Sequence, residues 1–456
     1  MLPSDGLHYR CAWIEDSVTI HCDGNVTCGL DDPHGQRSFG NIHSQSIAGI
    51  FSNPEYRRLQ NQLWSGRRCR DCGHFRRAEE SKDPRGETRA GLPGRLVVET
   101  TVKCNIRCPN PPCLANNEPT TRTRDKNSLP FEAFKRVADE LAGRLHTVLF
   151  YNYGEPFVNR EAETMLGYLR ERCPEAYILT STNGVLLADA ARAKAVVAAA
   201  PDHITFTISG VTQTAYARYH VRGQLAKALT GLRNVCEAKQ AGNRALPKIV
   251  WRYLVFHWND SDEEIEQAIS LAKQYGVDVL SLYLTNTPAG VRSVRFSPGS
   301  PSFLKYRNFI HRDDEGRLDH EYHCELPNQA GVYHLEELPG LGKARWTASR
   351  AIVRCNVQDG CIRLAVSLAR PTSPTTPYRC RIRLPWVSFV VSVRDGEWTE
   401  LSIDVPAERA DEESVEVEIT AEDYWFPAVE VRTADLRCLG VLVRVDESRS
   451  FPSTSD

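Results

Sequence analysis

Residues 95–113 read Arg-Leu-Val-Val-Glu-Thr-Thr-Val-Lys-Cys-Asn-Ile-Arg-Cys-Pro-Asn-Pro-Pro-Cys. The first part, residues 96–100, has the apolar and β-branched side chains of a buried strand. The second part places Cys104, Cys108 and Cys113 on one short loop. Three thiolates can hold three corners of an iron–sulfur cube and leave the fourth iron open for another ligand. The spacing alone also permits a zinc site that borrows a fourth ligand, or three unrelated thiols.

The loop belongs to a pattern of apolar strands and amphipathic helices that runs to about residue 287. The last helix is the best marked, because Ser261 and Glu264 have capping-box spacing and Gly276 suits the helix end. The alternation predicts a parallel sheet, either open and doubly wound or a partial barrel, with its active site at the carboxyl ends of the strands. The predicted strands are 96–100, 147–151, 177–180, 203–209, 249–257 and 277–284. The predicted helices are 131–145, 160–172, 188–199, 224–239 and 261–275.

The composition changes on both sides of this region. The last hundred residues contain alternations such as Val415, Val417 and Ile419 against Glu416 and Glu418, which are typical of half-buried antiparallel strands. We therefore predict a small N-terminal module, an α/β region and a C-terminal β-sandwich. The predicted parts are a cysteine-containing module (1–75), a linker (76–94), the α/β region (95–287), an irregular extension (288–344), the β-sandwich (345–447) and a flexible tail (448–456).

The composition excludes several classes of protein. The chain has 456 residues, 25% of them charged, and a formal charge of -2, so it has no overall field that would favour nucleic acid. No apolar run approaches 18 residues and the start lacks the pattern of a signal peptide, which predicts a cytoplasmic protein without membrane insertion. Fifteen cysteines, an odd number in a long chain, favour reduced thiols or metal ligands over disulfides.

Short motifs follow the next strands in a fixed order. They are Gly154-Glu155-Pro156 after the second strand, Thr182-Asn183-Gly184 after the third, residues 206–210 at the end of the fourth and residues 253–259 at the end of the fifth. Together with the cysteine loop and its Asn105, these motifs resemble the radical S-adenosylmethionine (SAM) superfamily over about 190 residues. The chain departs from the common pattern in two places. Four residues separate Cys108 from Cys113 where two are usual, and the fourth strand has Thr207 and Ser209 where Ser and Asp are common.

The resemblance implies a partial (βα)6 TIM-like barrel that binds SAM and a radical 4Fe–4S cluster. One electron from a flavodoxin- or ferredoxin-type donor would cleave SAM, and the 5′-deoxyadenosyl radical would remove a hydrogen atom from the substrate. The implied ligands of the radical cluster are Cys104, Cys108 and Cys113. The implied SAM-binding residues are Gly154, Glu155, Pro156, Ser181, Thr182, Asn183, Thr207, Ser209 and Arg252.

A second group of cysteines occupies the N-terminal module. This stretch resembles the SPASM-type auxiliary-cluster domain, through Cys11-Ala-Trp13, the 24–28 turn and the 66–72 ending. The resemblance implies an auxiliary 4Fe–4S cluster, and a zinc knuckle is the alternative. The ligands that we predict are Cys11, Cys28, Cys69 and Cys72, with Cys22 as a spare or substitute.

Two features bear on the substrate. Cys324 could return a hydrogen atom to a substrate radical, although an inert buried thiol is the simpler interpretation. Residues 424–427 and 435–441 are similar to β-sandwich modules of enzymes that assemble surface polysaccharides. We therefore predict hydrogen abstraction from a sugar, nucleotide-sugar or glycan intermediate, giving epimerisation or oxidation. The alternatives are a maturase that modifies a peptide or protein, and a non-catalytic metal-binding scaffold that binds glycan.

Overall fold

The computed structural model describes two compact units of the chain. The described residues are 9–11, 16–27, 35, 38–54, 56, 75–77, 92–109, 113, 124–313, 317–318, 325–370 and 378–445. The first unit comprises residues 1–254, 263–281 and 287–290, and the second comprises the remaining residues. Among the described residues, no helix has both the length and the apolar character that a membrane crossing requires.

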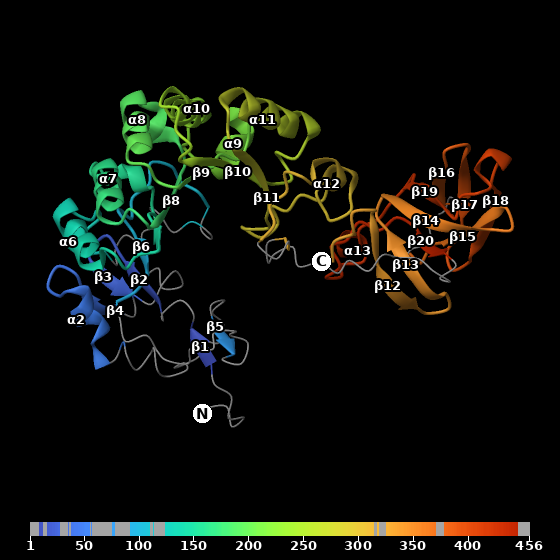
Figure 1. The fold of residues 1–456 in the computed structure, drawn as a ribbon, viewed down its shortest axis with the longest axis horizontal. Helices are drawn as coiled ribbons and strands as arrows, with labels where there is room; N and C mark the ends of the chain where they lie inside the picture. The colour runs from blue at the N-terminus through green and yellow to red at the C-terminus, as the bar shows by residue number, and fades with distance from the viewer. Residues whose placement is uncertain are drawn as a thin grey trace. The chain divides into compact units, whose positions relative to one another are not determined.

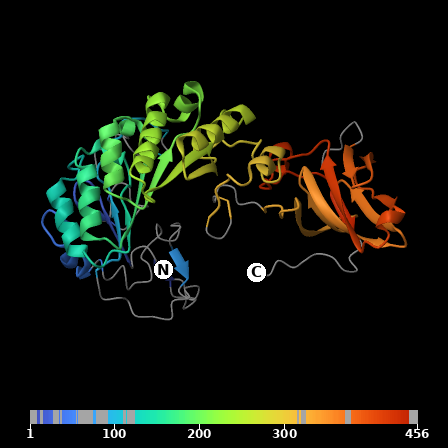
Figure 2. The same cartoon turned by 45° about the horizontal axis from the view of Figure 1, so that its top comes forward.

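The first unit is built on the predicted succession of strands and helices (Figure 1). The strands from β6 to β10 pair in parallel with their neighbours, and β11 lies next to β10. The helices lie on one side of these strands (Figure 2). The strands are β6 (Arg95–Val98), β7 (Thr147–Leu149), β8 (Tyr177–Thr182), β9 (His203–Thr207), β10 (Lys248–Val255) and β11 (Val279–Leu284). The helices are α6 (Phe131–Leu141), α7 (Ala162–Arg172), α8 (Ala190–Ala198), α10 (Leu225–Ala241) and α11 (Asp262–Tyr275).

The side chains of each strand alternate between a buried face and a partly open face. In β10, Trp251 and Tyr253 are fully buried, whereas Arg252 between them is only half-buried. Helix α6 covers the sheet with a stripe that contains Phe134, Val137 and Leu141. The predicted strands and helices agree with the observed ones because buried side chains recur every two residues in a strand and about every 3.6 residues in a helix. Helix α9 (Gln213–Tyr219) follows β9 and was not predicted.

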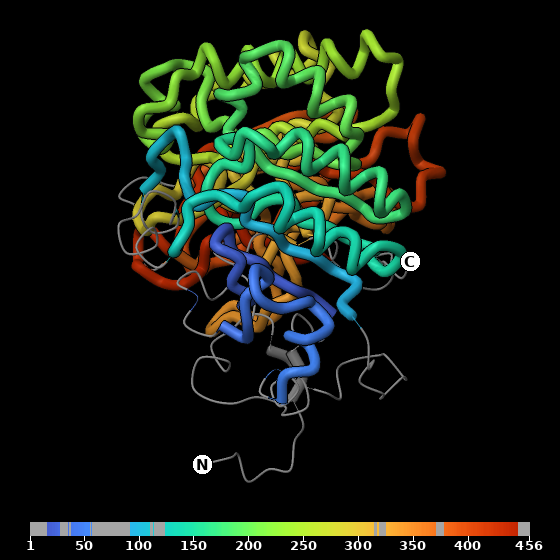
Figure 3. Tube along the Cα trace, turned by 90° about the vertical axis from the view of Figure 1, so that its left-hand side faces the viewer, coloured from blue at the N-terminus to red at the C-terminus, as the bar shows by residue number. Residues whose placement is uncertain are grey.

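The N-terminal module continues the sheet of the first unit. Strand β2 (Ser17–Ile20) pairs in parallel with β6, and the sheet extends to β3 (Asn25–Thr27) and β4 (Ser38–Asn41). Figure 3 shows this N-terminal part, in blue, beside the cyan trace of β6. Strands β2 and β3 form a hairpin that turns at Asp23-Gly24, with Gly24 at a φ of +89°. The other elements of the module are α2 (Ile47–Phe51) and the antiparallel pair of β1 (Tyr9–Cys11) with β5 (Phe75–Arg77).

The second unit is dominated by a nine-stranded antiparallel sheet. Its strand order is β12-β13-β20-β15-β14-β19-β16-β17, and β18 pairs with β15. All seven strands predicted for the C-terminal region are present. Two further strands precede them: β12 lies inside the segment that we expected to be irregular, and β13 begins at the end of that segment. The strands are β12 (Val332–Leu338), β13 (Gly342–Thr347), β14 (Arg350–Gln358), β15 (Cys361–Ser367), β16 (Tyr378–Arg383), β17 (Ser388–Val393), β18 (Thr399–Asp404), β19 (Ser414–Ala421) and β20 (Leu442–Val445).

The segment before β12 packs into this sheet. The Tyr333 hydroxyl donates to the carbonyl of Pro298, and the Cys438 amide donates to the same oxygen. A Cβ on Gly331, at a φ of +77°, would lie 2.1 Å from the carbonyl oxygen of Arg350. The short helix α12 (Pro301–Tyr306) lies in this segment, and α13 (Pro427–Glu430) follows β19. Sequence patterns missed this packing because it rests on backbone hydrogen bonds rather than on apolar periodicity.

A fully buried ion pair encloses the cysteine loop of the first unit. Glu99 lies just after β6, and its carboxylate accepts hydrogen bonds from Arg124 Nε at 2.8 Å and Arg124 Nη2 at 3.1 Å. Neither side chain is exposed. The Cys22 amide also donates to Glu99 Oε1, at 3.1 Å. The N-terminal hairpin, the end of β6 and the chain that follows the loop therefore share one buried carboxylate.

We expect Arg124→Met to destabilise the first unit by about 3–5 kcal/mol, because Glu99 would keep a buried charge without its partner. Urea unfolding followed by circular dichroism measures the effect. Lys135→Met is the control, because the ion pair of Lys135 with Asp139 is partly exposed to solvent and its loss should leave the midpoint nearly unchanged. Equal midpoints for Arg124→Met and the wild type would contradict the importance of the buried pair.

Candidate active site

The three cysteines of the loop lie together beyond the carboxyl end of β6. Each thiol is partly buried. Burial, helped by the nearby Glu155 carboxylate, raises the pKa of Cys104 to about 12. A hydrogen bond with Cys113, together with burial, raises the pKa of Cys108. The surroundings therefore disfavour free thiolates, and a bound metal is the partner that would stabilise them.

The turn after β7 presses against this loop. Gly154 has a φ of +86°, and a Cβ there would lie 2.2 Å from the carbonyl oxygen of Thr101. The amide of Glu155 donates to the carbonyl of Lys103 at 2.9 Å. Only glycine combines this backbone conformation with such a close approach. The turn at Gly154 therefore shapes the backbone that presents Cys104.

The Glu155 side chain points into the turn after β8. Its carboxylate accepts a hydrogen bond from the Thr182 hydroxyl at 2.7 Å and another from the Asn183 amide at 2.8 Å. Burial raises the pKa of Glu155 to about 7 despite these bonds. The Asn183 side chain then donates to Asn105 Oδ1 at 2.8 Å and to Cys104 Sγ at 3.7 Å. Glu155 and Thr182 thus position Asn183 beside the first cysteine.

A close helix contact supports the same turn. A Cβ on Gly231 of α10 would lie 2.0 Å from the carbonyl oxygen of Gly184, which has a φ of +78°. Pro156 begins the short 3₁₀ helix η2 (Pro156–Val158), and its carbonyl accepts from the Thr100 hydroxyl at 3.1 Å. The second 3₁₀ helix, η3 (Val185–Ala188), starts directly after Gly184. Backbone packing therefore fixes the turns that carry Glu155 and Asn183.

Two aromatic residues that the sequence did not reveal complete this part of the site. His220 follows α9, and its Nδ1 lies 3.6 Å from Cys108 Sγ. Tyr216 stacks on the His220 ring, with centroids 4.6 Å apart. Within the described residues, the buried Tyr216 hydroxyl and His220 Nε2 have no hydrogen-bond partner. Burial, then Cys108 and Cys104, raise the pKa of Tyr216. A buried hydroxyl without a partner near two thiols fits a site built to hold a cofactor.

The strand residues predicted to bind SAM fall into two groups. Register places Ser181 opposite Thr205, and Thr207 opposite Arg252, on the partly open face. Ser209 is fully buried, and its hydroxyl accepts a hydrogen bond from the amide of Leu254 at 3.2 Å. Ser181, Thr207 and Arg252 are therefore partly exposed on one face of the sheet, whereas Ser209 is buried and stabilises the strand next to it.

The remaining predicted ligands are described only in part. Cys11 lies in β1 opposite Phe75, but its side chain is outside the described part of the structure. Cys22 is buried, its thiol donates to the carbonyl of Lys126 at 3.2 Å, and burial raises its pKa. Cys22 is therefore engaged in the fold. The other predicted cluster ligands and the predicted hydrogen-atom donor lie outside the described residues; these are Cys28, Cys69, Cys72 and Cys324.

Two known families match the chain, one over the N-terminal module and one over most of the α/β region. Residues 11–73 match the SPASM family, described as an iron-sulfur cluster-binding domain, and residues 98–272 match the Radical SAM superfamily. Over 142 residues the chain is 28% identical to the Fe-coproporphyrin III synthase of Methanosarcina barkeri (strain Fusaro / DSM 804). That match covers 31% of this chain and 34% of the relative, so it spans about a third of the curated protein.

Solved structures show a more distant similarity. Methylornithine synthase matches with a TM-score of 0.30 and 14% identity, over 41% of this chain and 52% of that chain. The structure of anSMEcpe with bound AdoMet matches with a TM-score of 0.33 and 14% identity, over 53% of this chain and 70% of that chain.

We expect Gly154→Ala to remove about one 4Fe–4S cluster per chain, because its Cβ would collide with the carbonyl of Thr101 and displace the cysteine loop. Iron and sulfide analysis after anaerobic reconstitution measures the loss. Gly143→Ala is the matched control, since Gly143 has a similar φ of +74° but no atom within 4 Å of the added Cβ. Full iron content in Gly154→Ala would refute the close-packing argument.

Proposed function

The chain is a radical SAM enzyme with an N-terminal SPASM domain, and we propose that it removes a hydrogen atom from a sugar, nucleotide-sugar or glycan intermediate, giving epimerisation or oxidation. When bound, SAM and a 4Fe–4S cluster supply the 5′-deoxyadenosyl radical for such a step. The proposed site rests on one observation. Cys104, Cys108 and Cys113 lie beside two buried polar atoms, the Tyr216 hydroxyl and His220 Nε2, which have no hydrogen-bond partner among the described residues. The finer fold that we propose is a six-stranded partial barrel followed by a β-sandwich.

The residues of the first unit have separate tasks in this proposal. Cys104, Cys108 and Cys113 hold the radical cluster, and Glu155 positions Asn183 beside it. The other three groups act on SAM: the backbone of the 154–156 turn offers acceptors to its amino group, while Ser181 and Thr207 contact its hydroxyl groups and Arg252 its carboxylate. We propose Cys11, Cys28, Cys69 and Cys72 as ligands of the auxiliary cluster, and Cys324 as a hydrogen-atom donor to the substrate radical.

A groove in the second unit favours the proposal that the substrate is a carbohydrate. It is a hollow of about 640 Å³ between α12, the start of β14 and the end of β19, and it adjoins a second hollow of about 300 Å³. Tyr424 lines both hollows, and Phe426 lines the smaller one. Aromatic faces flanked by polar and charged groups offer both the apolar and the hydrogen-bonding contacts that a sugar ring needs. The polar groups of the groove include Ser302, Lys305, Arg307, Gln329 and Arg350.

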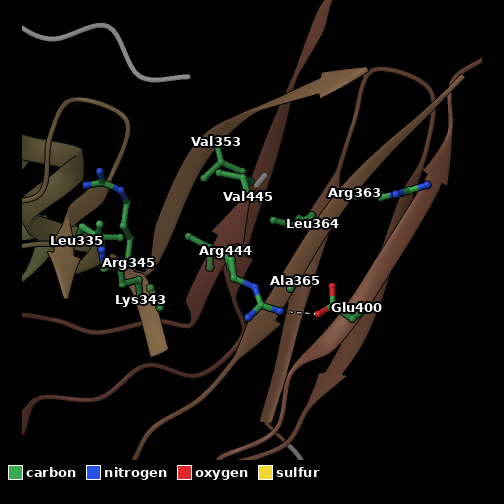
Figure 4. Close-up of a pocket in the computed structure, with 12 residues that line it drawn as sticks. Leu335, Lys343, Arg345, Val353, Arg363, Leu364, Ala365, Glu400, Arg444 and Val445 are labelled. Carbon is green, nitrogen blue, oxygen red and sulfur yellow. Dashed lines mark hydrogen bonds and ion pairs between the residues drawn. The ribbon is translucent and has the colours of Figure 1, made fainter. Parts of the chain in front are cut away.

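Another hollow of the second unit is a weaker candidate. It has a volume of about 370 Å³ and is lined by four cationic side chains, of which Arg444 is paired with Glu400 at 2.8 Å. Figure 4 shows Arg345 and Arg363 on opposite sides of the hollow, pointing away from each other. Because these guanidinium groups do not converge, they do not form a site for one anionic ligand. The groove at Tyr424 is therefore the better candidate.

We expect the reconstituted protein to contain about eight irons, the number in two 4Fe–4S clusters, and to release 5′-deoxyadenosine from SAM when reduced with dithionite. Cys104→Ala should abolish this cleavage, because the radical cluster would lose one of three ligands. Cys173→Ala, at a buried cysteine outside the loop, is the control that should retain it. Zinc in place of iron, or iron without cleavage in the wild type, would favour the non-catalytic scaffold.

We expect Tyr424→Ala to weaken sugar binding by about two- to tenfold, the range for loss of one aromatic stacking contact. Calorimetry with UDP-glucose and UDP-glucuronic acid measures the effect. Tyr177→Ala, which removes an exposed tyrosine of the first unit, should bind like the wild type. Binding of unstructured peptides and of none of these sugars would instead support the peptide maturase.

A further inference from the structure

We propose that His220 is a positioning residue for the radical cluster: its Nδ1–H donates a hydrogen bond to the Cys108 thiolate and raises the reduction potential of the cluster. The inference rests on the proposed function, because it requires that Cys104, Cys108 and Cys113 hold that cluster. It goes further by giving a task to a histidine that belongs to none of the motifs in the sequence.

The contact between His220 and Cys108 is held from both sides. His220 Nδ1 lies 3.6 Å from Cys108 Sγ, within the range of a hydrogen bond to sulfur. The next residues along each segment are also joined, because the Arg107 amide donates to the carbonyl of Val221 at 2.8 Å. The His220 amide donates to the carbonyl of Tyr216 at 2.9 Å, which continues the helical hydrogen bonds of α9. These backbone bonds therefore hold the two main-chain segments that carry Cys108 and His220 next to each other.

Aromatic packing fixes the plane of the imidazole ring. Tyr216 stacks on one face, at 4.6 Å and 30°, and the Tyr219 ring meets it nearly edge-on, at 5.0 Å and 86°. Only 2% of His220 is exposed. Water therefore does not compete for Nδ1, and the ring has little freedom to turn its other nitrogen towards the sulfur.

The chemistry of the two ring nitrogens assigns the proton. A thiolate bound to iron has no proton to donate, so the nitrogen that faces it must carry one. Among the described residues, His220 Nε2 has no hydrogen-bond partner. The alternative tautomer would bury an N–H at Nε2 with no acceptor and would set two lone pairs against each other at the thiolate. The neutral tautomer with its proton on Nδ1 avoids both costs.

A hydrogen bond to a cluster thiolate withdraws electron density from sulfur. It favours the reduced cluster, which carries one more negative charge, and the reduction potential rises. Loss of a hydrogen bond to a charged group changes an equilibrium by about tenfold. For a one-electron couple this corresponds to about 59 mV. In this chain the effect would ease the transfer of one electron from an external iron–sulfur or flavin donor.

The test compares wild type, His220→Leu and His220→Asn as full-length, anaerobically reconstituted proteins. A potentiometric titration follows the electron paramagnetic resonance signal that changes when SAM is added, which identifies the radical cluster. We expect the midpoint of His220→Leu to fall, so that about tenfold less cluster is reduced at a fixed potential. His220→Asn places an amide N–H near the Nδ1 position and should restore the midpoint. The midpoint of the auxiliary cluster should stay constant in all three proteins.

A second measurement does not depend on how the variants fold. Pulsed resonance of the reduced wild-type protein, prepared with ¹⁵N-histidine, should show a weak nitrogen coupling to the radical cluster. Its absence, or an unchanged midpoint in His220→Leu, would overturn the inference alone. A wild-type protein with no SAM-responsive signal would overturn the proposed function and this inference with it.

Discussion

The cysteine loop depends on one buried charge pair, Glu99 with Arg124. Glu99 lies before the loop and Arg124 after it, and neither side chain reaches solvent. Cys22 of the N-terminal hairpin donates its amide to the same carboxylate. A buried charge is stable only when its partners stay in place. The loss of one of these three segments would therefore destabilise the other two. The parallel pairing of β2 with β6 brings the Cys22 amide within reach, which makes the N-terminal hairpin part of the foundation of the loop.

The parallel sheet gathers the other parts of the site at the same edge. The turns after β7 and β8 and the end of α9 all meet the cysteine loop, because the carboxyl ends of parallel strands face one way. Gly154 touches its backbone, Asn183 reaches Cys104, and His220 reaches Cys108. The three groups that contact the loop are a backbone segment, a side-chain amide and an imidazole ring. Each of them belongs to a different segment that follows a strand, and each segment is fixed by its own packing. The thiols are placed by the whole sheet rather than by the loop alone.

Most of the fold follows from local patterns in the chain. All six strands and five helices predicted for the first unit are present, within a few residues at their ends, because strand alternation and helical stripes record which face is buried. The sequence patterns did not predict the elements whose packing depends on backbone atoms. Strand β12 lies in the segment predicted to be irregular and β13 begins there, and their place is set by long-range pairing such as that of β13 with β20. Helix α9 is only seven residues long, too short for a clear periodicity.

The sequence by itself determined the cysteine loop, the order of the turns that follow it and the succession of elements that delivers them to one sheet edge. Residue type and spacing are local properties, and they carry this information directly. Only the tertiary structure decided what the side chains do there. In the folded chain, the Glu155 carboxylate accepts a hydrogen bond from the amide of Asn183, and the Cys22 thiol donates to the carbonyl of Lys126. His220 lies beside Cys108. Such contacts join residues up to about a hundred positions apart, and their geometry exists only once distant backbone segments have been packed together.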